Sequence, residues 1–182
     1  MGQHFIGSGG DDSSSHYSFF MPYVILTIAL AVQSFHMLEH ISQLVQKFVL
    51  NSHAAHGLLG ASLDFEPVHF TYNTIYLALV VIVWLSFRNT PIRNMKGICG
   101  CLLPLITFVL VTQSWHFVEH AVKLEQHFIS GCLSCPGILG YYTDPILLHF
   151  AYNTIVFLPL VVVYVVFQYK FIINRDEKTS SM

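Results

Sequence analysis

Long apolar runs alternate with short polar segments along the chain. Four runs, covering residues 19–50, 67–87, 102–129 and 145–173, are long enough to cross a membrane. A transmembrane helix needs about 20 mostly apolar residues. Because the bilayer offers no water to the backbone, each run is expected to be helical. The sequence therefore predicts an all-α integral membrane protein with four transmembrane helices, the first beginning near Pro22, a favourable first-turn residue.

Polar residues interrupt the first and third runs at helical spacing. In the first run Gln33, His36, His40, Gln43 and Lys47 recur at steps of three and four residues, so they share one helix face. Histidine and glutamate are costly inside a membrane and mark functional sites there. This face is therefore expected to contact protein or water, not lipid.

The polar pattern occurs twice, at an offset of eighty residues. Ungapped comparison of 31–90 with 111–170 gives 21 identities in 60 positions, which retain the polar residues while most apolar positions vary. We therefore predict a four-helix bundle of two parallel tandem helical hairpins, related by a pseudo-twofold axis along the membrane normal. The hairpins are expected at 18–97, including a cytoplasmic loop, and at 98–173. Residues 1–17 are expected to form a mobile tail and residues 174–182 a cytoplasmic tail.

Composition and charge agree with a membrane protein and indicate its orientation. Only 10% of residues are charged, against roughly 25% in soluble domains. Lys and Arg occur in the 88–97 loop and the C-terminal segment but are absent from 51–65 and 131–144. The positive-inside rule then predicts cytoplasmic termini in a plasma membrane, with Lys47 and Lys123 snorkelling at the outer helix ends. The expected partners are the bilayer and other membrane subunits or a second copy. The net charge of −2 gives no reason to expect nucleic acid.

Each half offers a potential set of metal ligands. Two histidines at i and i+4 lie on one helix beside a glutamate, and a third histidine starts the next helix. The sets are His36, Glu39, His40 and His69, and His116, Glu119, His120 and His149. Imidazole and carboxylate ligands suit Zn, Fe or Cu. Nearby polar residues are expected to fix the imidazole tautomers, namely Gln33, Tyr72, Asn73, Gln113, Tyr152 and Asn153.

Other interpretations of the histidines remain open at this point. A b-type haem needs two axial histidines on facing helices, such as His36 with His116 or His40 with His120. A metal-free hydrogen-bonded network would join the helices. The leading hypothesis is a membrane metalloprotein, with sites toward the outer leaflet, that carries out redox or metal-activated chemistry on a small or lipophilic substrate. The alternatives are a haem- or metal-carrying subunit of a larger membrane complex and a His/Glu-lined proton or ion pathway.

The outer loops carry further candidates. Cys132 and Cys135 can form a disulfide, a redox-active pair, or half of a zinc site with His53 and His56. Asp64 and Asp144, which precede the second and fourth apolar runs, are expected to be helix N-caps, with a role as metal ligands as the alternative.

Overall fold

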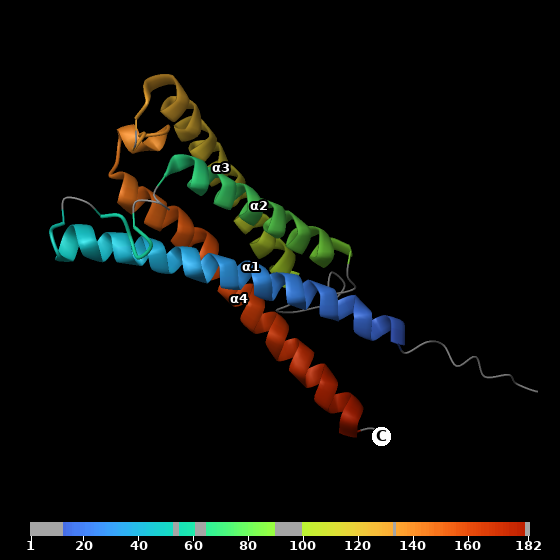
Figure 1. Ribbon diagram of the computed structural model, residues 1–182. Coiled ribbons are helices and arrows are strands. Elements are labelled where there is room, and N and C mark those ends of the chain that lie inside the picture. The colour runs from blue at the N-terminus through green and yellow to red at the C-terminus, as the bar shows by residue number, and fades with distance from the viewer. Residues whose placement is uncertain (1–12, 53–54, 61–64, 90–99, 133, 181–182) are drawn as a thin grey trace, which may run out of the picture.

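The computed structural model describes residues 13–52, 55–60, 65–89, 100–132 and 134–180, with side chains between Phe20 and Tyr169, and every regular element in these ranges is a helix. The elements in chain order are α1 (Ser13–Leu44), the π-helical turn η1 (Val45–Val49), α2 (Glu66–Asn89), α3 (Leu102–Ser130), the 3-10 turn η4 (Leu139–Tyr141) and α4 (Pro145–Ser180) (Figure 1). The four long helices have the length and apolar composition needed to cross a membrane. This confirms the prediction of four membrane-type helices.

The outer limits of α1 and α4 differ from the prediction. α1 begins at Ser13, so Pro22 lies inside the helix and the predicted start near Pro22 is wrong. A proline removes one backbone donor, which a long membrane helix tolerates while its other hydrogen bonds persist. Residues 13–17, expected in a mobile tail, are therefore helical, and residues 1–12 lie outside the described residues. α4 likewise continues to Ser180, through most of the expected C-terminal tail.

Local chemistry explains the sharper helix ends. α3 stops at Gly131, whose left-handed backbone (φ 69°) lets its amide bond the His127 carbonyl at 2.9 Å. α4 starts after Asp144, whose Oδ1 accepts a hydrogen bond from the Ile146 amide at 3.0 Å. This confirms the predicted N-cap at Asp144. Asp64, the other predicted cap, lies outside the described residues.

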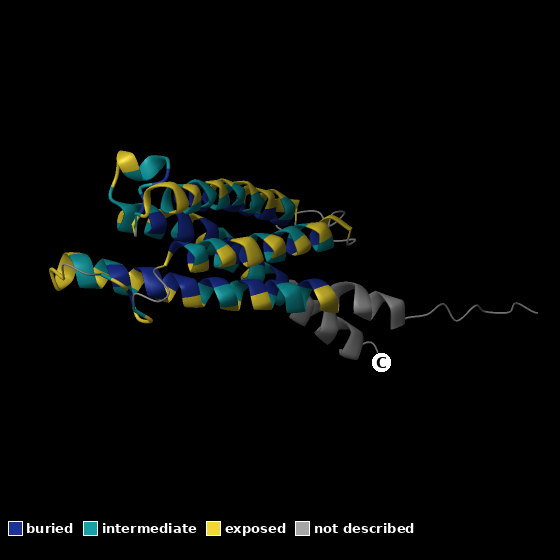
Figure 2. Cartoon of the chain, turned by 45° about the horizontal axis from the view of Figure 1, so that its top comes forward, coloured by how far each residue is buried: buried dark blue, intermediate teal, exposed yellow. Residues whose placement is uncertain are grey.

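Each long helix packs against two others. α1 contacts α4 and α2, and α3 contacts α2 and α4; the α1–α4 and α2–α3 pairs are the most extensive (Figure 1). Buried residues line the helix sides that face one another, and exposed residues cover the outside (Figure 2). The described residues that follow η1 and those that follow α3 leave the helices at one end, which we call the long-loop end (Figure 1).

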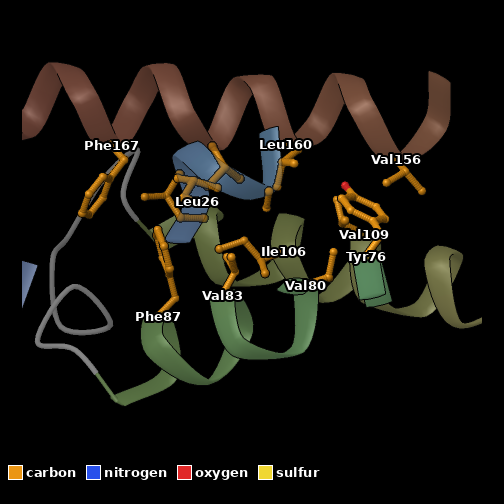
Figure 3. Packing of buried hydrophobic residues seen from close by; sticks show 13 residues of the cluster. Leu26, Tyr76, Val80, Val83, Phe87, Ile106, Val109, Val156, Leu160 and Phe167 are labelled. Atoms are coloured by element: carbon orange, nitrogen blue, oxygen red, sulfur yellow. The ribbon is translucent and has the colours of Figure 1, made fainter. Parts of the chain in front are cut away.

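An apolar core fills the half of the helices away from the long-loop end (Figure 3). All four helices contribute to it. Its buried members are Leu26, Ala29, Tyr76, Val80, Val83, Phe87, Leu102, Ile106, Val109, Val156, Leu160, Val163 and Phe167. The other half of the helices, nearer the long-loop end, holds the buried histidines. The packed core therefore supports one side of the polar layer.

Candidate metal centre

Two histidine trios form near the long-loop end, as predicted. α1 supplies His36 and His40, and α2 supplies His69. The second trio is His116 and His120 from α3 with His149 from α4. In each trio one ring nitrogen from every histidine lies within 4.8 Å of the others. All six side chains are buried, and each trio can hold a metal ion.

The first trio meets because α1 extends past the start of α2. α1 and η1 continue to Val49, nine residues beyond His40, which is about 14 Å of helix at 1.5 Å per residue. α2 begins at Glu66, only three residues before His69. A histidine far below the end of one helix therefore reaches the same level as a histidine in the first turn of its neighbour. The centroids of the His40 and His69 rings are 6.2 Å apart.

The two trios touch each other. The rings of His40 and His149 stack with centroids 5.7 Å apart and 6° between their planes. His69 and His120 stack with the same distance and angle. The His120 and His149 centroids are 4.9 Å apart. The six imidazoles thus form one contiguous group, which we call the six-histidine cluster.

The two histidines on α1 direct their Nε2 atoms toward each other, and so do the two histidines on α3. The Nε2 atoms of His36 and His40 are 3.1 Å apart, and those of His116 and His120 are also 3.1 Å apart. This spacing suits either an N–H···N hydrogen bond or two nitrogens that bind one metal ion. The i, i+4 spacing on a helix produces it, since such residues lie one above the other.

Three histidines have their tautomer set by an oxygen partner. The Nδ1 atom of His40 lies 2.8 Å from Oε1 of Gln43, that of His120 lies 2.6 Å from Oε1 of Glu66, and that of His149 lies 2.7 Å from the Pro145 carbonyl oxygen. Amide, carboxylate and carbonyl oxygens only accept hydrogen bonds, so each Nδ1 must donate. The neutral rings then carry their lone pair on Nε2, the form that binds metals.

The six residues predicted to fix the tautomers have other contacts. Gln33 donates to Asn153 Oδ1 at 2.8 Å, and Asn153 donates to the His149 backbone carbonyl at 2.8 Å. Gln113 and Asn73 make the equivalent chain to the His69 carbonyl, with distances of 3.0 and 2.9 Å. These bonds join α1 to α4 and α3 to α2. They position the backbones that carry the third histidine of each trio, while Gln43, Glu66 and Pro145 fix the tautomers.

The two predicted tyrosines cover the faces of histidine rings. Tyr72 stacks on His36 with centroids 4.3 Å apart, and Tyr152 stacks on His116 at 4.8 Å. The Tyr72 hydroxyl donates to the Val32 carbonyl at 2.5 Å. Each tyrosine therefore limits the rotation of the first histidine in its trio.

The two glutamates hold the long loops in place. Glu39 accepts hydrogen bonds from the amides of Leu58 at 2.9 Å and Leu59 at 3.4 Å. Glu119 accepts from Ile138 at 2.8 Å and Leu139 at 3.0 Å. The hydrogen bonds of both carboxylates are with loop amides, and Oε2 of Glu119 is buried without a hydrogen-bond partner. That either glutamate is a metal ligand stays a prediction. A carboxylate directed at two loop amides anchors the loop over the cluster.

A glutamine–glycine pair completes each loop anchor. The Gln46 side-chain amide donates to the Gly57 carbonyl at 2.8 Å and accepts from the Gly57 amide at 2.9 Å. Gln126 and Gly137 make the same two bonds at 3.1 and 2.8 Å. Both glycines have positive φ, and a Cβ atom at either would overlap the neighbouring glutamate carboxylate. Glycine is required at both positions for this close approach.

Sequence reasoning missed two charged residues in the cluster. Glu66, in the first turn of α2, is buried against His120. Lys123, expected to snorkel, is instead 4% exposed, with its Nζ 3.2 Å from His149 Nε2. Its position three residues after His120 on the polar face was the available signal. Buried charges are rare unless paired, so both belong to the site.

Lys47 and Asp144 form an ion pair at the long-loop end, between η1 and the start of α4. Partial burial alone would raise the pKa of Asp144. The hydrogen bond from Lys47 and those from the Leu147 and Ile146 amides outweigh it, so the pKa of Asp144 lies below its ordinary value. The pair connects the ends of two helices far apart in sequence.

The structure pairs Cys132 with Cys135 as a disulfide. Of the three arrangements open from the sequence, the cysteines are therefore bonded to each other and are not zinc ligands in this structure. His53, one proposed zinc partner, lies outside the described residues, and His56 is exposed. Cys101, at the start of α3, is a free and exposed thiol.

Comparison of the chain with protein-family models, curated proteins and solved structures finds no significant match. The geometry of the cluster is therefore the main indication of what the chain does.

Proposed function

We propose that the chain is a membrane metalloprotein with a dinuclear transition-metal centre held by the six-histidine cluster. Each trio would bind one ion through its ring nitrogens. The observation that carries the proposal is the convergence of two buried trios, each within 4.8 Å, whose rings also stack on each other. A purely structural network would need fewer histidines, because a single His–Glu pair can join two helices.

The nitrogen spacing supports metal ligation. With metal–nitrogen bonds of about 2.0–2.1 Å, the 3.1 Å between Nε2 atoms corresponds to an angle of about 100° at the metal. This angle lies between the octahedral and tetrahedral values. The oxygen partners of His40, His120 and His149 already direct a lone pair to Nε2. These three ligands therefore need no change of tautomer to bind an ion.

The donor set suits copper, zinc and iron alike, because imidazole binds all three metals. Copper or iron would support redox chemistry, and zinc would activate a bound water or carbonyl. The apolar core closes the half of the helices away from the cluster. A small or lipophilic substrate would therefore approach from the long-loop end or from the adjoining leaflet.

The same core argues against an ion pathway through the helices. Thirteen buried residues fill the space between the four helices, and all except Tyr76 lack a polar side-chain atom, so an ion there would lack the set of polar partners that it needs. The close packing of the imidazoles argues against a haem between them. The His116 ring already lies 4.8 Å from His120 and 5.8 Å from His149, centroid to centroid. A porphyrin, far larger than an imidazole, would have to separate these rings.

We also propose that the two halves are tandem repeats related by a pseudo-twofold axis along the membrane normal, packed as a bundle. The support is the recurrence of whole contact sets at an offset of eighty residues. The Gln46–Gly57 bonds recur at Gln126–Gly137, and the Gln33–Asn153 bond recurs at Gln113–Asn73. Duplication of a two-helix unit explains why two similar trios face each other.

The test is metal content of the purified full chain in detergent. The protein would be produced with Cu, Zn and Fe supplied, dialysed against a weak chelator, and analysed for metals and visible absorption. We expect up to two transition-metal ions per chain and no Soret band. The double variant His40→Ala/His120→Ala should lose at least about tenfold in metal affinity, as removal of ligands or their partners does. His56→Ala, an exposed histidine outside the trios, is the matched control.

Two results would contradict this function. A Soret band in the visible spectrum would show that the cluster binds haem and not a dinuclear metal centre. A folded, monodisperse wild-type protein that retains no stoichiometric metal would leave the hydrogen-bonded network as the role of the cluster.

A further inference from the structure

The two trios differ at one position of the polar helix face. Gln43 follows His40 by three residues on α1, and Lys123 follows His120 by three residues on α3. Gln43 accepts a hydrogen bond from His40 Nδ1 at 2.8 Å. Lys123 reaches the other helix of its trio, where its Nζ lies 3.2 Å from His149 Nε2. Gln43 therefore bonds the nitrogen of His40 that is not needed for a metal ion. Lys123, at the equivalent helix position, contacts Nε2 of His149.

The nitrogen that Lys123 contacts is the one a metal ion needs. His149 Nδ1 donates its hydrogen to the Pro145 carbonyl, so the lone pair of the neutral ring is on Nε2. An ammonium group has three donors and no acceptor, so Lys123 donates to that lone pair. A metal ion and the Lys123 amine therefore compete for one atom of the second trio.

We propose that Lys123 is an internal cation that holds the His149 lone pair, so that the two trios load metal unequally. This inference rests on the proposed metal centre. The first trio, His36, His40 and His69, is the high-affinity position. The second trio accepts its ion only when the Lys123 amine moves away from His149. The positive charge of Lys123 also repels a second cation, since Coulomb forces are strong where water is excluded.

Unequal loading follows from contacts near the metal position. Partners that orient or engage a ligand change metal affinity by about 10- to 100-fold. In the second trio Glu66 supports His120 while Lys123 opposes ligation by His149. In the first trio Gln43 supports His40. The chain would therefore carry one ion at low metal concentration and two at high concentration.

The test is a calorimetric titration of the metal-free full chain, in detergent, with Zn²⁺. Wild type should show two binding events that differ by at least about tenfold in Kd. Lys123→Gln gives position 123 the same residue type as the equivalent position 43. It should lower the Kd of the second binding event until it is close to that of the first. Lys123→Met, similar in length and without charge, should act in the same direction. Lys47→Gln makes the same charge change at the ion pair with Asp144 and should leave both events unchanged.

If wild type binds two Zn²⁺ ions with equal Kd values, the inference is overturned and the metal centre stays in place. The same conclusion follows if the Lys123 variants bind Zn²⁺ with the same two Kd values as wild type. A single event in wild type and in both Lys123 variants would show that the second trio is not a metal position, and would also overturn the inference. Absence of Zn²⁺ binding by wild type that elutes as folded protein in size-exclusion chromatography would overturn the proposed function itself. If one Lys123 variant fails to fold, the wild-type titration and the other variant still decide.

Discussion

At the scale of single residues, short hydrogen bonds determine which imidazole nitrogen is available in the cluster. His40, His120 and His149 each bond an oxygen through Nδ1, but the oxygens come from an amide, a carboxylate and a backbone carbonyl. A carboxylate partner makes its imidazole a more basic ligand than an amide does. His120, backed by Glu66, is therefore expected to be a stronger individual donor than His40, backed by Gln43.

Gly57 provides a test of how closely the loop approaches the site. Gly57→Ala would place a Cβ atom onto the Glu39 carboxylate and force a side chain into positive φ. We expect a loss of about 2–4 kcal/mol, combining about 1 kcal/mol of backbone strain with overpacking of about 1–3 kcal/mol. Thermal unfolding in detergent measures it. Gly60→Ala is the matched control, because Gly60 has a similar φ of 74° but nothing within 4 Å of its Cβ position. Equal losses in both variants would mean that the Glu39 contact contributes nothing.

At the scale of elements, the position of each histidine depends on where its helix begins or ends. The i, i+4 spacing was sufficient to predict that His36 and His40 share a face. It was not sufficient for Glu66 and His120, which lie 54 positions apart in sequence and meet only because α2 packs against α3. The wrong start of α1 has a similar origin. Pro22 is favourable in a first turn, yet the surrounding membrane helix accommodates it in the interior.

Asp144 combines two roles at the start of α4, and two variants separate them. Asp144→Asn keeps a good N-cap and removes the ion pair with Lys47, whereas Asp144→Ala removes both. We expect a loss of up to about 1 kcal/mol for the first and about 1 kcal/mol more for the second, measured by thermal unfolding. A larger loss in Asp144→Asn than in Asp144→Ala would contradict the capping role.

The ion pair also predicts a pH dependence. The folded pKa of Asp144 lies below its ordinary value of about 4. A lowered carboxyl pKa stabilises the folded state above the ordinary value, and this stabilisation is lost as pH falls through the lowered folded value. The difference in stability between wild type and Asp144→Asn should therefore be constant from pH 7 to about pH 5 and shrink below about pH 4. A difference that grows on acidification would contradict the sign.

At the scale of the whole molecule, the sequence predicted what lies within one helix better than how the helices pair. Apolar length identified the four membrane-type helices, and the polar periodicity identified both trios. The hydrogen bonds that join α1 to α4 and α2 to α3 depend on how the two halves dock. The buried position of Lys123 depends on pairing within one half, since its Nζ lies 3.2 Å from His149 Nε2 on α4. Periodicity along α3 alone does not show that this side chain turns toward its neighbouring helix instead of reaching water.

Orientation in the membrane remains a prediction, and native Cys101 can test it. The Lys/Arg distribution predicts that Cys101 faces the cytoplasm and that Tyr142 faces outward. Cys101 is a free exposed thiol, and Tyr142 is 87% exposed at the long-loop end. A membrane-impermeant maleimide added to intact cells should therefore leave wild type unlabelled and label Tyr142→Cys.

Permeabilised cells are the control, in which wild type should react as well. Cys132 and Cys135 add no background because they are disulfide-bonded, and the fourth cysteine, Cys99, is replaced by serine in both proteins. Labelling of wild type in intact cells without labelling of Tyr142→Cys would invert the orientation, and would place the six-histidine cluster in the cytoplasmic half of the membrane.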